Sequence, residues 1–450
     1  MIEAAKAAGP TVVVDGGGSL YPRRADDPPQ EAQRRAKAEA VLDAWGLVGI
    51  DAVALSADDW RFGRDAVEKR AAAGLPVLAA NLVCGDVRPF PASRVVERGG
   101  WKVGFVGVTA ATLDGCVVEE PLAAATSALA ALGDVDLRVL LAPVSATDLR
   151  RISDSKLAID FIVDPSGRTD AIPAAFAGGY GLAAGSRGKQ VGIATFQDGE
   201  GSGPWLAEGI VEQLERDRVR LGERRDASRE RAVTAADEAA KARFQKQVTA
   251  YDEQIRAKDD EIVAARAGAT GGGRRFSVAL HPLDADVADH APTAALLAKA
   301  LASLGPAPEA AAPRRAPPGS PFAGSDACAS CHPAEMSQWA TTPHAGAWAS
   351  LVTDGHAADA DCTACHATGV GKPGGPTGPG DVGGLRDVQC EACHGPAAAH
   401  IADPTKGGVT RDPAVELCTG CHDGERDGGR FEATAYRARV VHRSITSLQR

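Results

Sequence analysis

The motifs CASCH (328–332), CTACH (362–366), CEACH (390–394) and CTGCH (418–422) decide the fold of the last third of this chain. Each has two cysteines separated by two residues and followed at once by histidine. In such a motif the two thiols add to the vinyl groups of one haem, and the histidine binds its iron. A single C-x-x-C pair also occurs in zinc and redox sites. Four pairs, each followed by histidine, predict four covalently attached c-type haems.

The motifs assign a role to twelve residues. The predicted haem-attachment residues are Cys328, Cys331, Cys362, Cys365, Cys390, Cys393, Cys418 and Cys421. The predicted proximal iron ligands are His332, His366, His394 and His422. Residues 321–450 are too few to build a large apolar core around four haems, so the porphyrins themselves must supply much of it. We therefore expect a domain of short helices and loops.

The distal iron ligands must come from outside the motifs. The candidates that follow the proline-rich residues 305–320 are His344, His356, His400 and His442. Their number equals that of the irons, which would allow bis-histidine ligation throughout. Met336 lies only four residues after His332, and we interpret it as a packing residue. An iron without a distal ligand would instead permit chemistry on a small molecule.

Residues 1–204 alternate short β-branched runs with amphipathic stretches, which is typical of an α/β layered domain. The predicted strands are 11–15, 51–55, 76–82, 101–109, 137–141, 161–163 and 190–196, with a further one at 275–280. The predicted helices are 28–46, 65–74 and 121–132. We assign 269–304 to this same first domain, because a strand returns there.

A charged segment, 205–268, interrupts the first domain. Its seam residues, at spacings typical of a coiled coil, are Phe244, Val248, Tyr251, Ile255 and Ile262. An antiparallel helical hairpin is expected, either as a solvated structural insertion, which we favour, or as a docking arm for another protein. Residues 305–320 are rich in proline and predict a linker.

Charge and hydropathy exclude several classes of partner. The formal net charge is −10, which argues against a nucleic-acid partner. No apolar run reaches the roughly 18 residues that a membrane-spanning helix needs. The first residues lack the apolar core of a secretory signal, although haem c is attached outside the cytoplasm of bacteria. We therefore expect the natural precursor to begin further upstream and the protein to lie in the periplasm or on the outer face of the envelope.

The region 321–445 resembles the tetrahaem cytochrome c family typified by the electron acceptor of hydroxylamine oxidoreductase. The segments that carry this resemblance are CASCHPAEMSQWATTPHAGAW, CTACHATGVG, VQCEACHGPAAAH and CTGCHDGERDGGRF. In that family the histidine after the W-x-x-x-x-H run and the one after C-H-G-P are distal ligands. The resemblance implies this role for His344 and His400, and a third such role for His442. His356 is outside the pattern, and the family keeps one haem without a strong distal ligand.

Residues 10–204 resemble the metallophosphoesterase domain of the 5'-nucleotidase family, a sandwich of two sheets flanked by helices. The segments that carry it are TVVVDGGGSL, GIDAVALSADDWRFG, LPVLAANL, KVGFVGVT and GGYGLAAG. Such enzymes hold two metal ions at strand ends. The aligned ligand positions hold Gly18, Ala57, Asp58, Pro143, Ser166 and Arg168. The first ligand motif would precede Met1, so we expect an N-terminally incomplete and catalytically silent domain.

Two cysteines, Cys84 and Cys116, lie outside any metal-binding spacing. Buried free thiols are the default interpretation, and a disulfide is the alternative in an oxidising compartment.

As a whole, the sequence predicts an envelope electron-transfer protein with redox protein partners. The alternatives are a haem oxidoreductase acting on a small nitrogen or sulfur species, and a nucleotidase with a haem tail, which the lost ligands disfavour.

Overall fold

The structure, a computed structural model of the whole chain, describes residues 1–21, 31–111, 113–165, 175–176, 178–185, 188–198, 203–235, 237–270, 273–284, 286–305, 313–424 and 429–442. The chain forms two compact units, and each is described by itself. The first contains Met1–Arg23 and Val41–Asp289, and the second contains Arg24–Ala40 and His290–Arg450.

The unit boundary differs from the predicted one at two places. Helix α8 (Ala291–Ser303) groups with the second unit and not with the first. There, Gln33 of helix α2 (Glu31–Val48) donates to the carbonyl of Leu304 just beyond α8, at 3.1 Å. The predicted linker is also shorter, since Arg314 already forms an ion pair with Asp387 at 2.9 Å. The linker residues 306–312 lie outside the described part.

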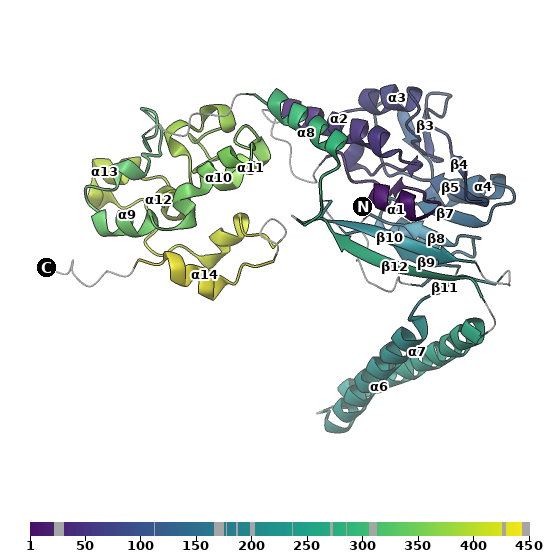
Figure 1. Ribbon diagram of the computed structural model, residues 1–450. Coiled ribbons are helices and arrows are strands. Elements are labelled where there is room, and N and C mark those ends of the chain that lie inside the picture. The colour runs from purple at the N-terminus through teal and green to yellow at the C-terminus, as the bar shows by residue number, and fades with distance from the viewer. Residues whose placement is uncertain are drawn as a thin grey trace. The chain divides into compact units, whose positions relative to one another are not determined.

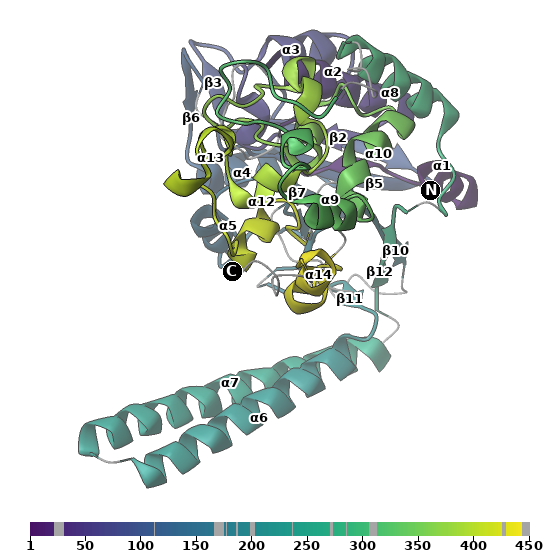
Figure 2. The ribbon, with the colours of Figure 1, turned by 90° about the vertical axis from the view of Figure 1, so that its left-hand side faces the viewer.

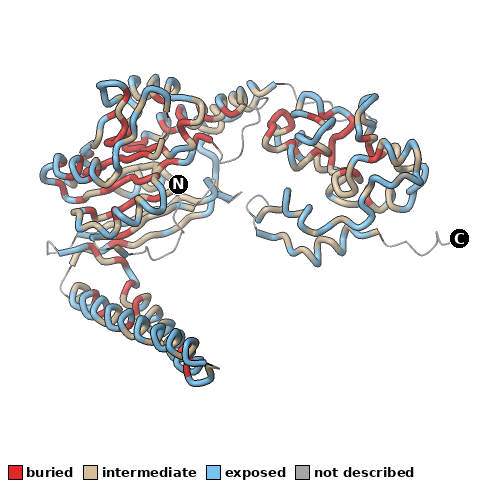
Figure 3. The backbone as a smooth tube through the Cα atoms, turned by 180° about the vertical axis from the view of Figure 1, so that it is seen from behind, coloured by how far each residue is buried: buried red, intermediate tan, exposed pale blue. Residues whose placement is uncertain are grey.

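A five-stranded sheet forms the core of the first unit, in the order β4-β5-β7-β8-β9. Its strands are β4 (Ser93–Arg98), β5 (Trp101–Gly107), β7 (Leu137–Leu141), β8 (Phe161–Val163) and β9 (Tyr180–Leu182). Strands β5, β7, β8 and β9 are parallel, and β4 is antiparallel to β5. Successive side chains point to opposite faces, so Val139 and Leu141 pack on one face and Leu140 on the other. Figure 3 shows buried residues, in red, along strands inside the first unit.

The two faces of this sheet are covered differently (Figure 1). On one face lies a second sheet, made of β10 (Gln190–Gln197), β12 (Arg275–Pro282) and β11 (Leu206–Ala207). Phe161 and Phe276 join the two sheets edge to face, with ring centres 4.8 Å apart. Helices α4 (Pro121–Ala131) and α5 (Ala146–Ser153) cover the other face through Leu129 and Ile152. The predicted sandwich of two sheets is present.

Two small strand pairs complete the first unit. They are the parallel pair β1 (Val14–Asp15) and β2 (Ala52–Val53), and the antiparallel pair β3 (Leu82–Cys84) and β6 (Cys116–Val118). Helices α1 (Ile2–Ala8) and α3 (Asp65–Ala72) belong to the same unit. Of the predicted strand 76–82, the structure keeps only a bridge at Val77 and the start of β3.

Cys84 and Cys116 form a disulfide, so the default interpretation as free thiols is wrong. The antiparallel pairing of β3 with β6 places these residues directly opposite each other, with Cα atoms 4.0 Å apart. Their separation of 32 residues along the chain gave no sign of this contact. Pairing register alone brings the two sulfur atoms together.

The charged segment forms a helical hairpin of α6 (Ile210–Thr234) and α7 (Glu238–Thr270). Figures 1 and 2 show the two helices side by side, extending away from the sheets of the first unit. Of the predicted seam, Ile255 and Ile262 are buried, and Phe244, Val248 and Tyr251 are partly exposed. Leu214 of α6 is also buried and packs with Ile262 in the core cluster of the first unit. The outer faces carry ion pairs such as Arg220–Asp217, at 2.8 Å. Exposed pairs of this kind add little stability, so the seam holds the hairpin together.

The second unit consists of short helices and loops, as predicted. Besides α8 and the first part of α2, its α-helices are α9 (Pro333–Trp339), α10 (Ala347–Thr353), α11 (Ala360–His366), α12 (Cys390–His394), α13 (Ala398–Ala402) and α14 (Ala433–Val440). Over 313–424 and 429–442 no strand forms, and the one bridge there joins Ala367 to Arg386. Its apolar cluster is small and centres on Trp348, Leu351 and Val382. Across the described residues, no helix has the length and apolar character needed to cross a membrane.

Candidate haem-binding site

Each attachment motif forms a helical or hydrogen-bonded turn. The second motif ends α11, the third is α12, and the fourth begins within the 3-10 turn η8 (Val415–Gly420). The first motif is a turn that follows η3 (Ser325–Ala327). In the first motif the backbone N–H of His332 donates to the carbonyl of Cys328 at 2.9 Å, and His422 makes the same bond to Cys418. Residues three and four apart on a helical turn share a face. The two cysteines and the histidine of each motif can therefore meet one haem.

Two of the proximal histidines are oriented by backbone carbonyls. Nδ1 of His366 lies 2.7 Å from the carbonyl oxygen of Ala347, and Nδ1 of His394 lies 2.6 Å from that of Thr410. A hydrogen bond at Nδ1 fixes the ring and leaves Nε2 free to bind a metal. These carbonyls come from α10 and from the loop after α13, which the motif spacing alone did not indicate.

Two histidine pairs have the separation that a haem iron requires. The ring centres of His344 and His422 are 6.3 Å apart, and those of His394 and His442 are 6.2 Å apart. A metal–imidazole bond is about 2 Å long and the ring centre lies about 1 Å further, so two axial rings on one iron have centres about 6 Å apart. Both pairs join a predicted proximal ligand to a predicted distal one. The residues present therefore fit a six-coordinate haem at each of these places.

The predicted distal members of these pairs, His344 and His442, have lowered pKa values, which favours their neutral form. Burial lowers the pKa of His344, and the facing His422 lowers it further. Burial likewise lowers the pKa of His442, with His394 acting in the same direction. A neutral imidazole has a free ring nitrogen for a metal. Nδ1 of His442 lies 3.2 Å from Oε1 of Gln338, which leaves Nε2 as its ligand atom.

Neighbouring motifs lie close together through their cysteines. The thiols of Cys328 and Cys390 are neighbours, and their interaction raises the pKa of Cys328 and lowers that of Cys390. Burial raises the pKa of Cys393, and the adjacent Cys418 adds to this effect. The first motif thus adjoins the third, and the third adjoins the fourth.

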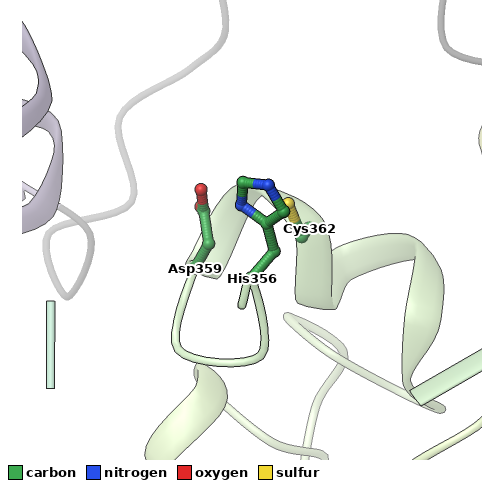
Figure 4. Close-up of side chains that lie close together, drawn as sticks. All are labelled: His356, Asp359 and Cys362. Carbon is green, nitrogen blue, oxygen red and sulfur yellow. The ribbon is translucent and has the colours of Figure 1, made fainter. Parts of the chain in front are cut away.

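A second cluster surrounds the start of the second motif (Figure 4). The ligand atoms of His356, Asp359 and Cys362 all lie within 4.8 Å of one another. Asp359 is already paired with Lys37 of α2 at 2.6 Å, and burial raises the pKa of the Cys362 thiol to about 12. Both effects oppose a metal ion at this cluster, and Cys362 is also a predicted haem-attachment residue. His356 therefore lies beside a predicted attachment point of the second haem.

In the first unit the structure brings together several of the aligned phosphoesterase positions. A Cβ on Gly17 would lie 2.9 Å from Ser56 N and 3.1 Å from Pro143 Cβ, so three strand-end loops converge here. The buried carboxylate of Asp59 accepts hydrogen bonds from the N–H groups of Gly18, Leu20 and Ser56, at 2.6–2.8 Å. Among the described residues, no group of three metal-ligand side chains forms at this edge. Ser166 and Arg168 lie outside the described residues.

The comparisons with known proteins agree with the haem geometry. Residues 327–395 match the family described as cytochrome c554 and c-prime, and residues 383–427 match the doubled CXXCH motif family. The C-terminal part of this chain is therefore similar to multihaem c-type cytochromes. Among curated proteins, no relative matches the sequence.

The first unit has partial likenesses among solved structures. They include the sulfate thiohydrolase SoxB of Thermus thermophilus, with 21% identity, a TM-score of 0.38 and coverage of 44% of this chain and 38% of that one. A 5'-nucleotidase precursor from Thermus thermophilus has 18% identity, a TM-score of 0.37 and 44% coverage of each chain. The NAD nucleotidase of Haemophilus influenzae has 16% identity and a TM-score of 0.25, covering 28% of this chain and 25% of that one. The chain thus spans less than half the length of each of these proteins.

A buried polar segment, 387–391, links several loops of the second unit. Its alternate residues Asp387, Gln389 and Glu391 are 1–3% exposed, and each binds a different part of the chain. Asp387 accepts from Arg314 and from the N–H of Trp348, and Gln389 accepts from the N–H of Ser325. Glu391 accepts from the N–H groups of residues 323, 324 and 397. No motif marks these residues in the sequence, and the alternation of their polar side chains is the signal that could have revealed them.

The remaining distal candidate, His400, lies on α13. The N–H of Ala398 donates to the carbonyl of Pro321 at 3.0 Å, which holds α13 against the segment that leads into the first motif. Nδ1 of His400 is buried and has no hydrogen-bond partner. Among the described residues, no imidazole ring faces His332 or His366 in the way that His344 faces His422 and His442 faces His394.

Proposed function

We propose that this protein is a tetrahaem cytochrome of the cell envelope that transfers electrons between redox partner proteins. The observation that carries the proposal is the iron-sized separation of His344 from His422 and of His394 from His442. An iron closed by two imidazoles passes electrons and leaves no position for a substrate. The bound haems supply the one-electron chemistry. The chain attaches them, orients their ligands and shields them from water.

The histidine pairs support a specific ligand assignment, with the haems numbered by their motifs. Haem 4 takes His422 and His344, and haem 3 takes His394 and His442. His400 is the distal ligand of haem 1, which the attachment of α13 to the segment before the first motif supports. His332 and His366 are the proximal ligands of haems 1 and 2.

The order of the haems follows from the cysteine contacts. Cys328 neighbours Cys390, and Cys393 neighbours Cys418, which supports a path through haems 1, 3 and 4. Electrons pass fastest between porphyrins whose edges are close, so adjacent attachment points favour adjacent transfer steps. The redox partners would exchange electrons at the ends of such a path.

The disulfide supports a location outside the cytoplasm. Structural disulfides persist in oxidising compartments and are rare in the reducing cytoplasm. Covalent haem attachment and the Cys84–Cys116 bond therefore favour the same compartment, the periplasm or the outer face of the envelope.

A second candidate function is chemistry on a small nitrogen or sulfur species at haem 2. The favouring observation is the place of His356, which lies beside Cys362 and is not paired with His366. Without a distal imidazole the iron of haem 2 would be open to a small ligand.

The test of the proposal is the haem content of the protein matured with the c-type attachment machinery. Intact-mass spectrometry should show four covalent haems, and acid-acetone should extract none of them because the bonds are thioethers. A mass showing two haems or fewer, with zinc in the remaining motifs, would contradict the proposal.

A further inference from the structure

Glu391 is a buried carboxylate inside the third haem-attachment motif, between Cys390 and Cys393. Its side chain is 3% exposed. Oε1 accepts hydrogen bonds from the N–H groups of Ala323 and Ala397, at 2.9 and 2.7 Å, and Oε2 accepts from that of Gly324 at 2.8 Å. All of these contacts are N–H donors, which suit an ionised carboxylate because it can only accept hydrogen bonds.

The carboxylate lies between two attachment points. Ala323 and Gly324 lead directly into the 3-10 turn η3 (Ser325–Ala327) and Cys328, the first cysteine of haem 1. Cys390, the first cysteine of haem 3, adjoins Glu391 in sequence, and its thiol neighbours that of Cys328. The charge of Glu391 acts on both thiols.

We propose that Glu391 places a fixed negative charge between haems 1 and 3 and thereby lowers the reduction potential of both. The inference rests on the proposed attachment of haems at these two motifs. Reduction adds one electron to a haem, and a negative charge nearby opposes that step. The effect is large only where water does not screen the charge, and the burial of Glu391 meets this condition. The three N–H groups are dipoles, so they reduce the field of the carboxylate without cancelling its unit charge.

The same contacts give Glu391 a structural role, which the test must separate from the electrostatic one. Glu391→Gln keeps the size of the side chain and removes its charge. Glu391→Asp keeps the charge and shortens the side chain, which weakens the bonds to residues 323, 324 and 397. A structural role predicts similar changes in both variants, whereas a charge effect predicts a change of potential in Glu391→Gln alone.

The experiment is a spectroelectrochemical titration of the full-length, haem-loaded protein, with its melting temperature as a second readout. Glu391→Gln should raise the potentials of two haems, so that the ratio of reduced to oxidised haem at a fixed electrode potential rises about tenfold, or about 59 mV for one electron. Glu391→Asp should leave the potentials unchanged even if it melts earlier. The matched control is Glu416→Gln, which removes the same charge from an exposed residue near the fourth motif and should shift nothing.

The outcomes that overturn the inference are distinct from those that overturn the proposed function. Four attached haems with unshifted potentials in Glu391→Gln, or with equal shifts in Glu391→Gln and Glu391→Asp, would contradict the role of the charge alone. Wild-type protein without haem at the first and third motifs would contradict the proposed function. If Glu391→Gln does not mature, Glu391→Ala is titrated in its place: potentials of two haems raised in Glu391→Ala but not in Glu391→Asp support the inference, and unchanged potentials in Glu391→Ala overturn it.

Discussion

In the second unit, buried polar side chains hold distant loops together. In the first unit, an apolar core does this. Asp387, Gln389 and Glu391 are almost fully buried, and each satisfies backbone N–H groups from a distant loop. A loop-rich chain leaves many backbone groups without helix or sheet partners, and burying them unpaired is costly. These three residues therefore fix the loops that carry the haem motifs.

The predicted distal histidines determine whether each haem iron is closed, as in an electron carrier, or open to a small ligand, as in an enzyme. We expect His344→Ala to create a new high-spin signal in the EPR spectrum of the oxidised protein, because the lost imidazole leaves only water to bind the iron. His356→Ala should look like the wild type, in which we expect one haem to be high-spin already. Four low-spin haems and no high-spin signal in the wild type would favour the pure carrier and contradict this expectation.

At the scale of secondary-structure elements, helix α2 is held by polar contacts, whereas the helices of the hairpin are held by apolar ones. The first part of α2 is tied to the loop before α11 by polar contacts: Gln33 bonds the backbone of Ala358 and Ala360, and Lys37 pairs with Asp359. Although burial alone would lower the pKa of Lys37, its bonds to Asp359 and Asp361 raise it. The hairpin is instead held by a narrow apolar seam with charged outer faces.

The seam makes a prediction about the hairpin. Ile255→Ala should destabilise the hairpin by about 2 kcal/mol, the lower end for a buried isoleucine, because the seam is partly open to water. Hydrogen exchange should then speed up in 210–270 while the haem spectra stay unchanged. Val263→Ala is the control, since Val263 is 66% exposed on the same helix and should change little. Equal effects of the two variants would show that the seam does not hold the hairpin.

At the scale of the whole molecule, the first unit is an α/β sandwich. The carboxylates in its strand-end loops are occupied by hydrogen bonds within the protein. Both oxygens of Asp59 are occupied by backbone N–H groups, and Asp15 accepts from Gly17 and Ser19. Burial raises the pKa of Asp15, and the nearby charge of Asp59 acts in the same direction. Carboxylates whose oxygens already accept hydrogen bonds from the protein are poor ligands for a pair of metal ions.

We therefore predict that the full-length protein has no phosphoesterase activity. After incubation with manganese or zinc and desalting, elemental analysis should find iron from the haems but no pair of added metal ions. Nucleotide monophosphates should not be hydrolysed. Turnover at ordinary enzyme rates, about 1 per second or more, would refute the prediction.

The sequence by itself determined what depends on residues close together in the chain. A C-x-x-C-H motif spans one helical turn, so its chemistry is complete within five residues, and strands β7 and β8 match their apolar runs residue for residue. The limits of helix α4 were likewise predicted to within a residue, because its apolar pattern and its first proline are local.

Only the tertiary structure decided which distant residues meet. The pairing of His344 with His422, the Cys84–Cys116 bond and the bonds of Glu391 all join segments far apart in the chain. Strand β4 was missed because its charged, exposed residues pair only where β5 offers an edge. The physical reason is common to all: local motifs are read along the backbone, whereas long-range contacts depend on the register and packing of segments whose own patterns do not specify their partners.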